Sequence, residues 1–550
     1  MNGSGIAGRQ DRTGYRRGLR WIGALAVLAA VLILPERITD LKLSAVSRLP
    51  VELPLIVAAL VLLAGRSRAV LRGAVVAMLA VMLPFKIANM ATYFGFDRPF
   101  EPLVDVLMVP TALDTLSKTA GMGAAAAAVL VVAVIVAMIV TALTWATGIL
   151  VQDVSRTARR SIAAAAALAA ALGFSPYATT AATVFVRDQA IAISQGLRDA
   201  AQFRAELLED PFSNLPPLSR LAKLKGNDVL LIFVESYGRA SLDNPAHSPL
   251  LRGNLRRFAD ALKAGGFSAR SAWMTSPTFG GESYLAHSTA VSGLWVNNQQ
   301  RYAQLLRSSR SSLISDFNGA GWRTVAVMPE ITMPWPEADY FKYGKIYSAP
   351  ELAYKGESFD YLTMPDQYTL ATFHNFELAP KERPPVMAEI ALISSHIPWA
   401  PIPKLVPWAD VGDGSVFTTA RTPETANEIW RDAKRVAEYY ALSVDYTLQT
   451  LMSFVTTFGR DNMLVIILGD HQPMTFIAGE DANHEVPVHI IARDPELLAA
   501  LDEGTWTDGM EPDKTSPSWP MDSLRGRLLG AFTPRPDGTL SPATGSGQKP

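Results

Sequence analysis

Five apolar stretches fill most of the first 190 residues, and no other sequence feature constrains the fold as strongly. A helix needs about 20 mostly apolar residues to cross the hydrocarbon core of a bilayer. The stretches that approach this length are 21–34, 49–65, 73–96, 124–151 and 161–186. They predict an α-helical membrane domain of about five spans in residues 1–186. A signal peptide is the alternative interpretation of the first stretch, but four further apolar stretches and the lack of a convincing cleavage site argue against it.

The distribution of basic residues between the stretches predicts an orientation. Loops on the cytoplasmic side of a membrane carry an excess of Lys and Arg. One set of loops holds Arg9, Arg12, Arg16, Arg17, Arg20, Arg66, Arg68, Arg72, Arg156, Arg159 and Arg160. The alternate loops hold only Arg37, Lys42, Arg48, Arg98 and Lys118. We therefore expect a multi-pass protein of a bacterial inner (plasma) membrane, with a cytoplasmic N-terminus and a periplasmic or extracellular C-terminal part. Lys86, inside the third stretch, is expected either to reach an interface or to face the bundle interior.

Composition changes after the apolar half. Residues 187–208 predict an amphipathic helix near the membrane surface, and prolines at 211, 216 and 217 end it. This juxtamembrane helix and linker spans 187–225, a soluble domain spans 226–533, and a Pro-, Gly- and Ser-rich tail at 534–550 is expected to be disordered. The chain has no cysteine, which excludes disulfides, cysteine-bound zinc and a cysteine nucleophile. Its formal net charge of −1 gives no basic field for nucleic acid.

The soluble domain alternates strand and helix signals. Short continuous apolar runs lie at 229–234, 324–327, 386–392 and 463–468, and helical patterns lie at 254–264, 312–319 and 426–458. Continuous apolar runs are typical of strands buried on both faces of a sheet. Their alternation with helices predicts an α/β fold with a mainly parallel central sheet. Active sites in such folds lie beyond the carboxyl ends of the strands.

Three of the predicted strands end at residues that can bind a metal. Glu235 follows the first run, His396 follows the third closely, and Asp470 and His471 follow the last. Carboxylate oxygens and imidazole nitrogens at one sheet edge can form a site for a divalent ion. An isolated Asp-His pair is more often a capped turn, but Glu235 follows a buried strand, where an unpaired carboxylate is costly.

A glycine-rich turn supplies a candidate nucleophile. Gly280 and Gly281 precede Ser283, which begins a predicted helix. A hydroxyl at a helix N-terminus lies near oriented N–H groups that favour phosphate. The alternative is that Ser283 is an ordinary helix cap.

Together and in this order, these motifs resemble the alkaline phosphatase/sulfatase superfamily. The resemblance is to its membrane-anchored branch of lipoteichoic acid synthases and phosphoethanolamine or phosphoglycerol transferases. It implies that Glu235, Asp470, His471 and the nucleophile bind one divalent ion, Mn²⁺ or Zn²⁺. Sulfatases keep their nucleophile ten residues before the Gly of a Thr-Gly pair. Ser283 lies ten before Gly293 of Ser292-Gly293, which favours it over Thr278.

Further roles follow from the same resemblance. His396 is expected to be catalytic, and the residues expected to contact substrate are His287, His484, Thr278 and Trp335. Nine of the eleven Trp follow residue 226, where some could line a lipid or glycan cleft, although core packing explains most of them. Residues 283–287 read Ser-Tyr-Leu-Ala-His and lack the Pro and Arg of a true sulfatase site.

The resemblance implies transfer of a phosphoglycerol or phosphoethanolamine group from a phospholipid to an envelope glycan or lipid, through a phospho-enzyme. A membrane-tethered phosphodiesterase, phosphatase or sulfatase-like hydrolase is the alternative enzyme, since the same site would serve with water as acceptor. An inactive receptor or scaffold is a third possibility. The presence of Glu235, Asp470 and His471 argues against it.

The orientation can be tested with a reporter enzyme that is active only after export. A fusion at about residue 225 should be active, because five crossings place this point outside. A fusion at about residue 65, in an arginine-rich loop, is the matched control and should be inactive. An inactive fusion at residue 225 would overturn the predicted topology.

Overall fold

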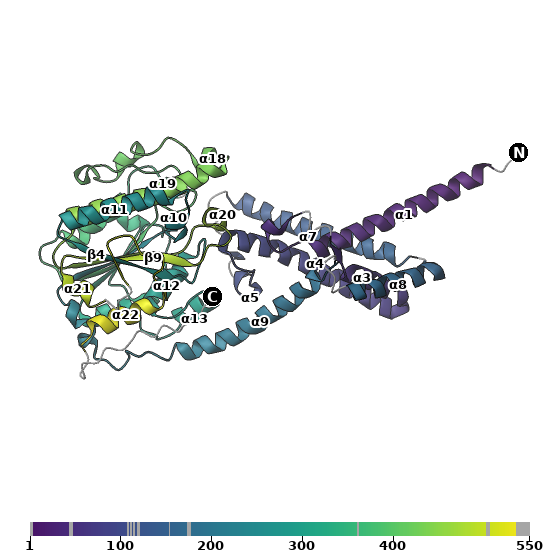
Figure 1. Cartoon of the computed structure of the whole chain (residues 1–550), viewed down its shortest axis with the longest axis horizontal. Helices are drawn as coiled ribbons and strands as arrows, with labels where there is room; N and C mark the ends of the chain where they lie inside the picture. The colour runs from purple at the N-terminus through teal and green to yellow at the C-terminus, as the bar shows by residue number, and fades with distance from the viewer. Residues whose placement is uncertain are drawn as a thin grey trace. The chain divides into compact units, whose positions relative to one another are not determined.

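The computed structural model forms two compact units, and it describes residues 4–42, 48–106, 109–110, 113, 116–117, 121–152, 154–172, 178–359, 362–501 and 506–534. The first unit comprises Met1–Phe94 and Arg98–Asp199, and the second comprises Gly95–Asp97 and Ala200–Pro550. The first is helical, whereas the second is an α/β domain (Figure 1).

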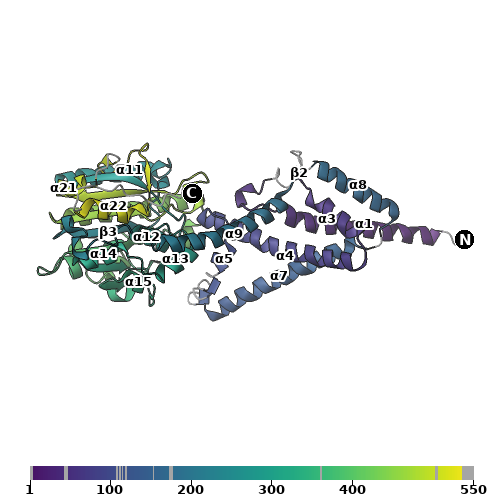
Figure 2. The same cartoon turned by 90° about the horizontal axis from the view of Figure 1, so that it is seen from below.

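The helical unit is built mainly from helices of different lengths (Figure 2). They are α1 (Ser4–Ile33), α3 (Glu52–Leu62), α4 (Gly65–Phe96), α7 (Met122–Leu150), α8 (Arg156–Leu172) and the first part of α9 (Ala181–Glu206). Helix α1 packs on α7 and α3 packs on α8, around a core that includes Leu28, Val57, Leu79 and Leu143. The apolar faces of these helices pack together and give the unit its own core.

Two of the five predicted membrane spans have the required length and composition. Within the described residues, α4 and α7 are long and apolar enough to cross a bilayer. The prediction for 49–65 is wrong in length, because α3 has only 11 residues. The chain leaves the helix at Leu63, whose backbone is extended, and Gly65 then takes φ +57°, a conformation glycine adopts readily. The stretch 161–186 is divided between α8, which ends at Leu172, and α9, which begins at Ala181.

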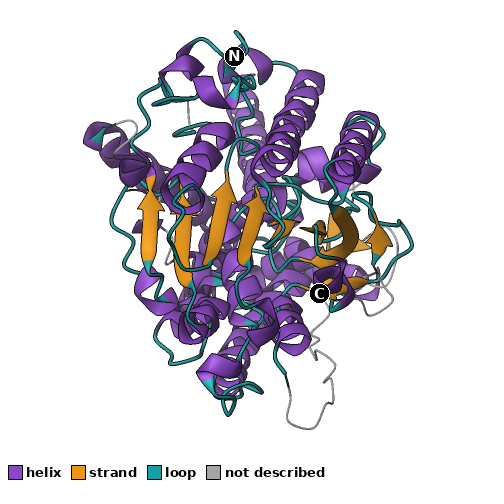
Figure 3. Cartoon of the chain, turned by 90° about the vertical axis from the view of Figure 1, so that its left-hand side faces the viewer, coloured by secondary structure: helices purple, strands orange, loops and turns teal. Residues whose placement is uncertain are grey.

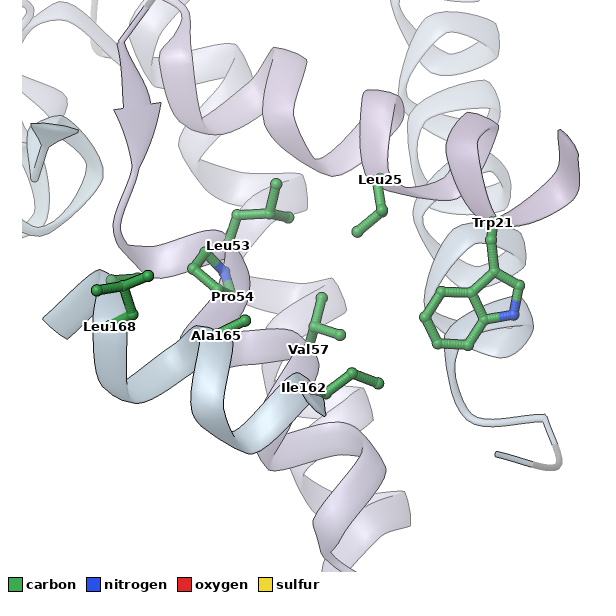
Figure 4. Close-up of a pocket in the computed structure, with 9 residues that line it drawn as sticks. Trp21, Leu25, Leu53, Pro54, Val57, Ile162, Ala165 and Leu168 are labelled. Carbon is green, nitrogen blue, oxygen red and sulfur yellow. The ribbon is translucent and has the colours of Figure 1, made fainter. Parts of the chain in front are cut away.

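Lys86 faces the interior of the helical unit. Its ammonium group is buried and donates to the backbone oxygens of Val31, Leu32 and Leu34 at 3.3, 3.0 and 2.7 Å. These oxygens lie at the C-terminal end of α1, where carbonyls have no partner within the helix. Lys86 therefore caps α1 by a long-range contact. Elsewhere in this unit, α1, α3 and α8 border an apolar groove of about 390 Å³ (Figure 4).

A nine-stranded sheet organises the α/β unit (Figure 3). Its strand order is β10-β4-β9-β8-β3-β7-β5-β6, with β11 beside β4. The strands from β8 to β6 are parallel to one another, and only β9 and β10 run against their neighbours. The predicted mainly parallel sheet is therefore confirmed. The bounds are β3 (Asp228–Val234), β4 (Ser268–Thr275), β5 (Arg323–Met328), β6 (Lys345–Ser348), β7 (Val386–Leu392), β8 (Met463–Gly469), β9 (Glu485–Ala492), β10 (Thr507–Asp508) and β11 (Ser518–Pro520).

Helices cover both faces of this sheet (Figure 1). The buried strand β3 serves both layers, because Ile232 packs into one core cluster and Leu231 into the other. Helices α11 (Ser248–Ala264) and α19 (Ala433–Phe458) cover one face, and α12 (Ser283–Ser292), α14 (Leu313–Ala320) and α22 (Ser523–Phe532) cover the other. The helix predicted at 426–458 is divided, since α18 (Ala426–Ile429) ends before the Asp432 cap of α19.

Residues 200–225 pack against the α/β unit. Arg525 bridges Asp210 and Asp316 at 2.9 and 2.8 Å, and Arg220 contacts Asp316 at 2.6 Å. The long C-terminal segment of the second unit begins at Ala200. Helix α9 runs through the boundary expected between residues 186 and 187. Of the tail expected at 534–550, only Pro534 lies within the described residues.

The buried ion network gives a stability prediction. Asp316 is fully buried between Arg220 and Arg525, so Asp316→Asn removes the charge that compensates two guanidinium groups. We expect a loss of about 3–5 kcal/mol in the free energy of unfolding. Asp461→Asn is the control, because Asp461 pairs with Arg493 while 90% exposed, and should cost less than about 1 kcal/mol. Denaturant titration followed by circular dichroism measures both, and equal losses would contradict the account.

Candidate active site and metal centre

Three adjacent parallel strands bring the predicted site residues to one edge of the sheet. Strand β3 lies between β7 and β8, and the three strands end level with one another, with Val234 opposite Leu392 and Gly469. Glu235 leaves the central strand, Asp470 and His471 leave β8, and His396 follows β7. A side chain at Gly469 could not be accommodated, because its Cβ would lie 1.9 Å from the Tyr237 oxygen. This close approach joins the ends of β3 and β8.

Glu235, Asp470 and His471 form a buried cluster of possible metal ligands. One ligand atom from each lies within 4.8 Å of the others. The Nε2 atom of His471 is 3.5 Å from Glu235 Oε1 and 3.8 Å from Asp470 Oδ2. Its Nδ1 lies 2.7 Å from the oxygen of Gln472, which can only accept a hydrogen bond. The proton is therefore on Nδ1, and the Nε2 lone pair faces the carboxylates.

Ser283 completes this cluster. Its Oγ donates to Glu235 Oε2 at 3.0 Å and lies 3.1 Å from His471 Nε2. Ser283 is the first residue of α12, and the N-cap position belongs to Glu282. The interpretation of Ser283 as an ordinary cap is therefore wrong, because its hydroxyl points at the cluster rather than at the helix backbone. Gly280 (φ +70°) and Glu282 (φ +61°) form the left-handed turn that aims the helix start.

Thr278, the competing hydroxyl, makes no side-chain hydrogen bond to the described residues of the cluster. It is 4% exposed, and within the described part of the chain its Oγ1 has no hydrogen-bond partner. It precedes the glycine turn in the loop after β4. The geometry therefore favours Ser283 as the nucleophile.

The two carboxylates of the cluster respond to one another. Burial raises the pKa of Asp470 well above its usual range, and the neighbouring Glu235 carboxylate raises it further. Burial also acts to raise the pKa of Glu235, but the imidazoles of His471 and His396 and the Ser236 hydroxyl outweigh it and lower that pKa to about 2. The two carboxylates are thus hard to ionise together, and a bound cation would favour their ionised forms.

His396 lies on the opposite side of Glu235 from β8. Its Nδ1 donates to the oxygen of Ile397 at 2.5 Å, and its Nε2 is 3.8 Å from Glu330 Oε1. Burial acts to lower the pKa of His396, but Glu235 and Glu330 raise it above the ordinary value. Glu330 was missed by the sequence analysis, although it follows the predicted strand at 324–327 and the strand-end rule would have found it.

His287 lies one turn after Ser283 on α12. Its Nδ1 contacts Glu389 Oε1 at 3.1 Å, and Glu389 also accepts a hydrogen bond from the Tyr343 hydroxyl at 2.7 Å. Glu389 and Tyr343 were not predicted, because a Glu inside a continuous apolar run gives no sign of its partner. The two remaining predicted residues lie further out. The ring of His484 packs on Phe279 at 5.4 Å, and that of Trp335 lies 6.2 Å from Tyr343.

The donor set fits a divalent ion. Two carboxylates, one imidazole with its nitrogen lone pair directed inward, and one hydroxyl are ligands that Zn²⁺ and Mn²⁺ both accept. The buried carboxylate pair also needs a cation to be fully ionised.

Comparison with known proteins gives a family for this part of the chain. Residues 227–493 match the family model described as sulfatase, and they contain every predicted site residue. The α/β unit therefore contains a sulfatase-family domain, which indicates an enzyme that acts on phosphoric or sulfate esters. No curated protein matched the chain.

Three solved structures illustrate the fold similarity. The lipoteichoic acid synthase LtaP from Listeria monocytogenes is 10% identical, covers 58% of this chain and 75% of its own, and has a TM-score of 0.38. For the phosphoglycerol transferase GacH from Streptococcus pyogenes these values are 13%, 61%, 80% and 0.38. For the C-terminal periplasmic domain of EptC from Escherichia coli they are 15%, 56%, 82% and 0.36. Similarities this low carry no argument about the reaction.

The cluster predicts metal content. Purified protein should hold about one divalent ion per chain, and Asp470→Ala should remove most of it, because a buried ligand is lost. Glu330→Gln is the control, since Glu330 lies near His396 but outside the cluster, and should leave the metal content unchanged. Inductively coupled plasma mass spectrometry measures the content. Retention of the metal by Asp470→Ala would contradict the assignment.

Proposed function

We propose that the protein is a membrane-anchored transferase that moves a phosphoglycerol or phosphoethanolamine group from a phospholipid to an envelope glycan or lipid. The observation that carries this proposal is the Ser283 hydroxyl, held 3.0 Å from Glu235 and 3.1 Å from His471 at the start of α12. A hydroxyl hydrogen-bonded to buried metal-ligand types is the arrangement that nucleophilic transfer of an ester group requires.

The chemistry is a double displacement at phosphorus. Ser283 Oγ attacks the phosphorus of the donor headgroup, a bond from Oγ to phosphorus forms, and the bond from phosphorus to the diacylglycerol oxygen breaks. The serine hydroxyl loses its proton, and the departing diacylglycerol oxygen gains one. In the second step an acceptor hydroxyl attacks phosphorus and loses its proton, and the Ser283 oxygen leaves and regains one. A divalent ion bound by Glu235, Asp470, His471 and Ser283 would lower the pKa of the attacking hydroxyl and polarise the phosphoryl group.

The histidines around the cluster supply positive charge and protons. His396, whose pKa is raised by Glu235 and Glu330, is suited to donate a proton to the departing oxygen. We assign to His287 and His484 the contacts with the phosphoryl oxygens or the headgroup. The backbone N–H groups at the start of α12 offer a further site for a phosphoryl oxygen.

Location of the donor in the membrane follows from the helical unit. Helices α4 and α7 are long and apolar enough to anchor the chain in a bilayer. An enzyme anchored there has phospholipid headgroups as an abundant ester substrate, and envelope glycans or lipids as hydroxyl acceptors. Nucleic acid does not match the composition, since the formal net charge is −1.

Liposomes with headgroup-labelled phospholipids test the proposal. Wild-type enzyme should release diacylglycerol and carry the label on the peptide that contains Ser283. Ser283→Ala should abolish turnover and labelling, because the Ser283 hydroxyl is the one held between Glu235 and His471. Thr278→Ala, the matched control, should leave measurable activity. Intact-protein and peptide mass spectrometry read out the adduct.

Each other outcome has a distinct meaning. An adduct on Thr278, or an active Ser283→Ala enzyme, would contradict the nucleophile assignment. Cleavage of soluble phosphodiesters with the lipids untouched would instead support a membrane-tethered hydrolase.

A further inference from the structure

We propose that Glu389 is a positioning residue that fixes His287 with its Nε2 atom directed away from the sheet, toward the phosphoryl group bound at Ser283. The inference rests on the proposed phosphoryl transfer at Ser283. It assigns a role to a buried carboxylate that lies outside the metal cluster and that the reaction scheme above does not use.

Glu389 occupies an unusual place for an acidic residue. It lies in the middle of β7, is 2% exposed, and stands opposite Leu231 of β3 and Ala326 of β5 in the sheet. An apolar side chain would be cheaper here, because a buried carboxylate is costly unless hydrogen-bond donors surround it. Its two oxygens each have one donor, His287 Nδ1 at 3.1 Å and the Tyr343 hydroxyl at 2.7 Å.

These contacts define the state of the imidazole. Tyr343 donates a hydrogen bond to Glu389. Burial, and next the neighbouring Glu389 carboxylate, raise the pKa of the Tyr343 hydroxyl well above its usual value. An ionised carboxylate can only accept, so Nδ1 of His287 carries a proton. The Nε2 atom, on the far side of the ring, then points away from Glu389.

The ring is also held by packing. The imidazole of His287 stacks on Phe233 with 3.7 Å between ring centroids and 15° between planes. His287 is four residues after Ser283 on α12, so both side chains lie on the same face of that helix. It is close enough to Asp470 and Glu330 to interact with both electrostatically. The imidazole is thus fixed by a carboxylate, an aromatic ring and a helix, beside the nucleophile.

This arrangement gives the imidazole a defined task. With Nδ1 held by Glu389, the Nε2 side of His287 is free to contact a phosphoryl oxygen beside Ser283, where an imidazolium N–H would stabilise negative charge. Without the carboxylate, the ring loses the hydrogen bond that sets its orientation. Glu389 contacts no reacting atom and acts through His287.

A comparison of Glu389→Gln, His287→Gln and the double variant tests the assignment, with a chromogenic phosphodiester as substrate and the full-length enzyme. Glu389→Gln should lower kcat about 100-fold with little change in KM, because the effect is on proton and charge placement during the reaction. The double variant should be no slower than His287→Gln alone, because Glu389 acts only through that ring. Tyr343→Phe, which keeps the carboxylate, should lose far less.

A second readout does not depend on turnover. Inorganic phosphate should bind to Glu389→Gln about tenfold more weakly than to wild type by calorimetry, since a charged hydrogen bond to the anion is lost. Unchanged metal content and an unchanged unfolding midpoint identify a folded variant with an intact cluster. The inference is overturned if folded Glu389→Gln keeps wild-type kcat and phosphate affinity, or if the two single losses multiply in the double variant. A phosphodiester substrate separates this result from the lipid donor, because failure to use lipids leaves the Glu389 comparison intact.

Discussion

The burial of two neighbouring carboxylates, Glu235 and Asp470, is the constraint on which the site depends. Each is almost fully excluded from water. Burial and the neighbouring Glu235 carboxylate raise the pKa of Asp470 far above its usual range. Such a pair is stable only when positive charge or protons compensate it. His471 directs its Nδ1 to a backbone oxygen, which leaves Nε2 facing the carboxylates. A divalent ion is the partner that satisfies both carboxylates, the imidazole lone pair and the Ser283 hydroxyl together.

The parallel pairing of β7, β3 and β8 is what makes this burial possible. Residues far apart in the chain, such as Glu235 and Asp470, become adjacent because parallel strands end at the same edge. The Ser236 N–H donates to Asp470 Oδ1 at 2.8 Å, so the backbone after one strand holds the carboxylate after the next. Gly469 allows that approach by leaving no Cβ against the Tyr237 oxygen. The core helices supply the remaining side chains on this frame.

Local patterns predicted the parts of the fold and site that depend on neighbouring residues in the sequence. Apolar runs marked β3, β5, β7 and β8, and the residues after them marked Glu235, His396 and Asp470. Long-range pairing escaped prediction. Strands β4 and β9 are less apolar runs that gain stability by pairing with one another across more than 200 residues. The role of Glu389 could be inferred only from the structure, in which α12 brings His287 against it. The predicted number of five membrane spans is not confirmed for another reason. Apolar composition does not reveal that α3 ends at Leu63.

The charges around Ser283 are arranged on two sides of the nucleophile. Glu235 and Asp470 lie on one side with His471, and they favour a cation. His396 and His287 lie beyond them, each turned toward its own acidic partner, Glu330 or Glu389, and they favour an anion. In the proposed reaction, a phosphoryl group attached to Ser283 would lie between these regions, with one oxygen near the cation and its other oxygens near the imidazoles. The acidic partners of the histidines therefore serve to position the imidazoles, as the carboxylates of the cluster would position the cation. In the proposed reaction, one set of charges binds the cation and the other binds the phosphoryl oxygens.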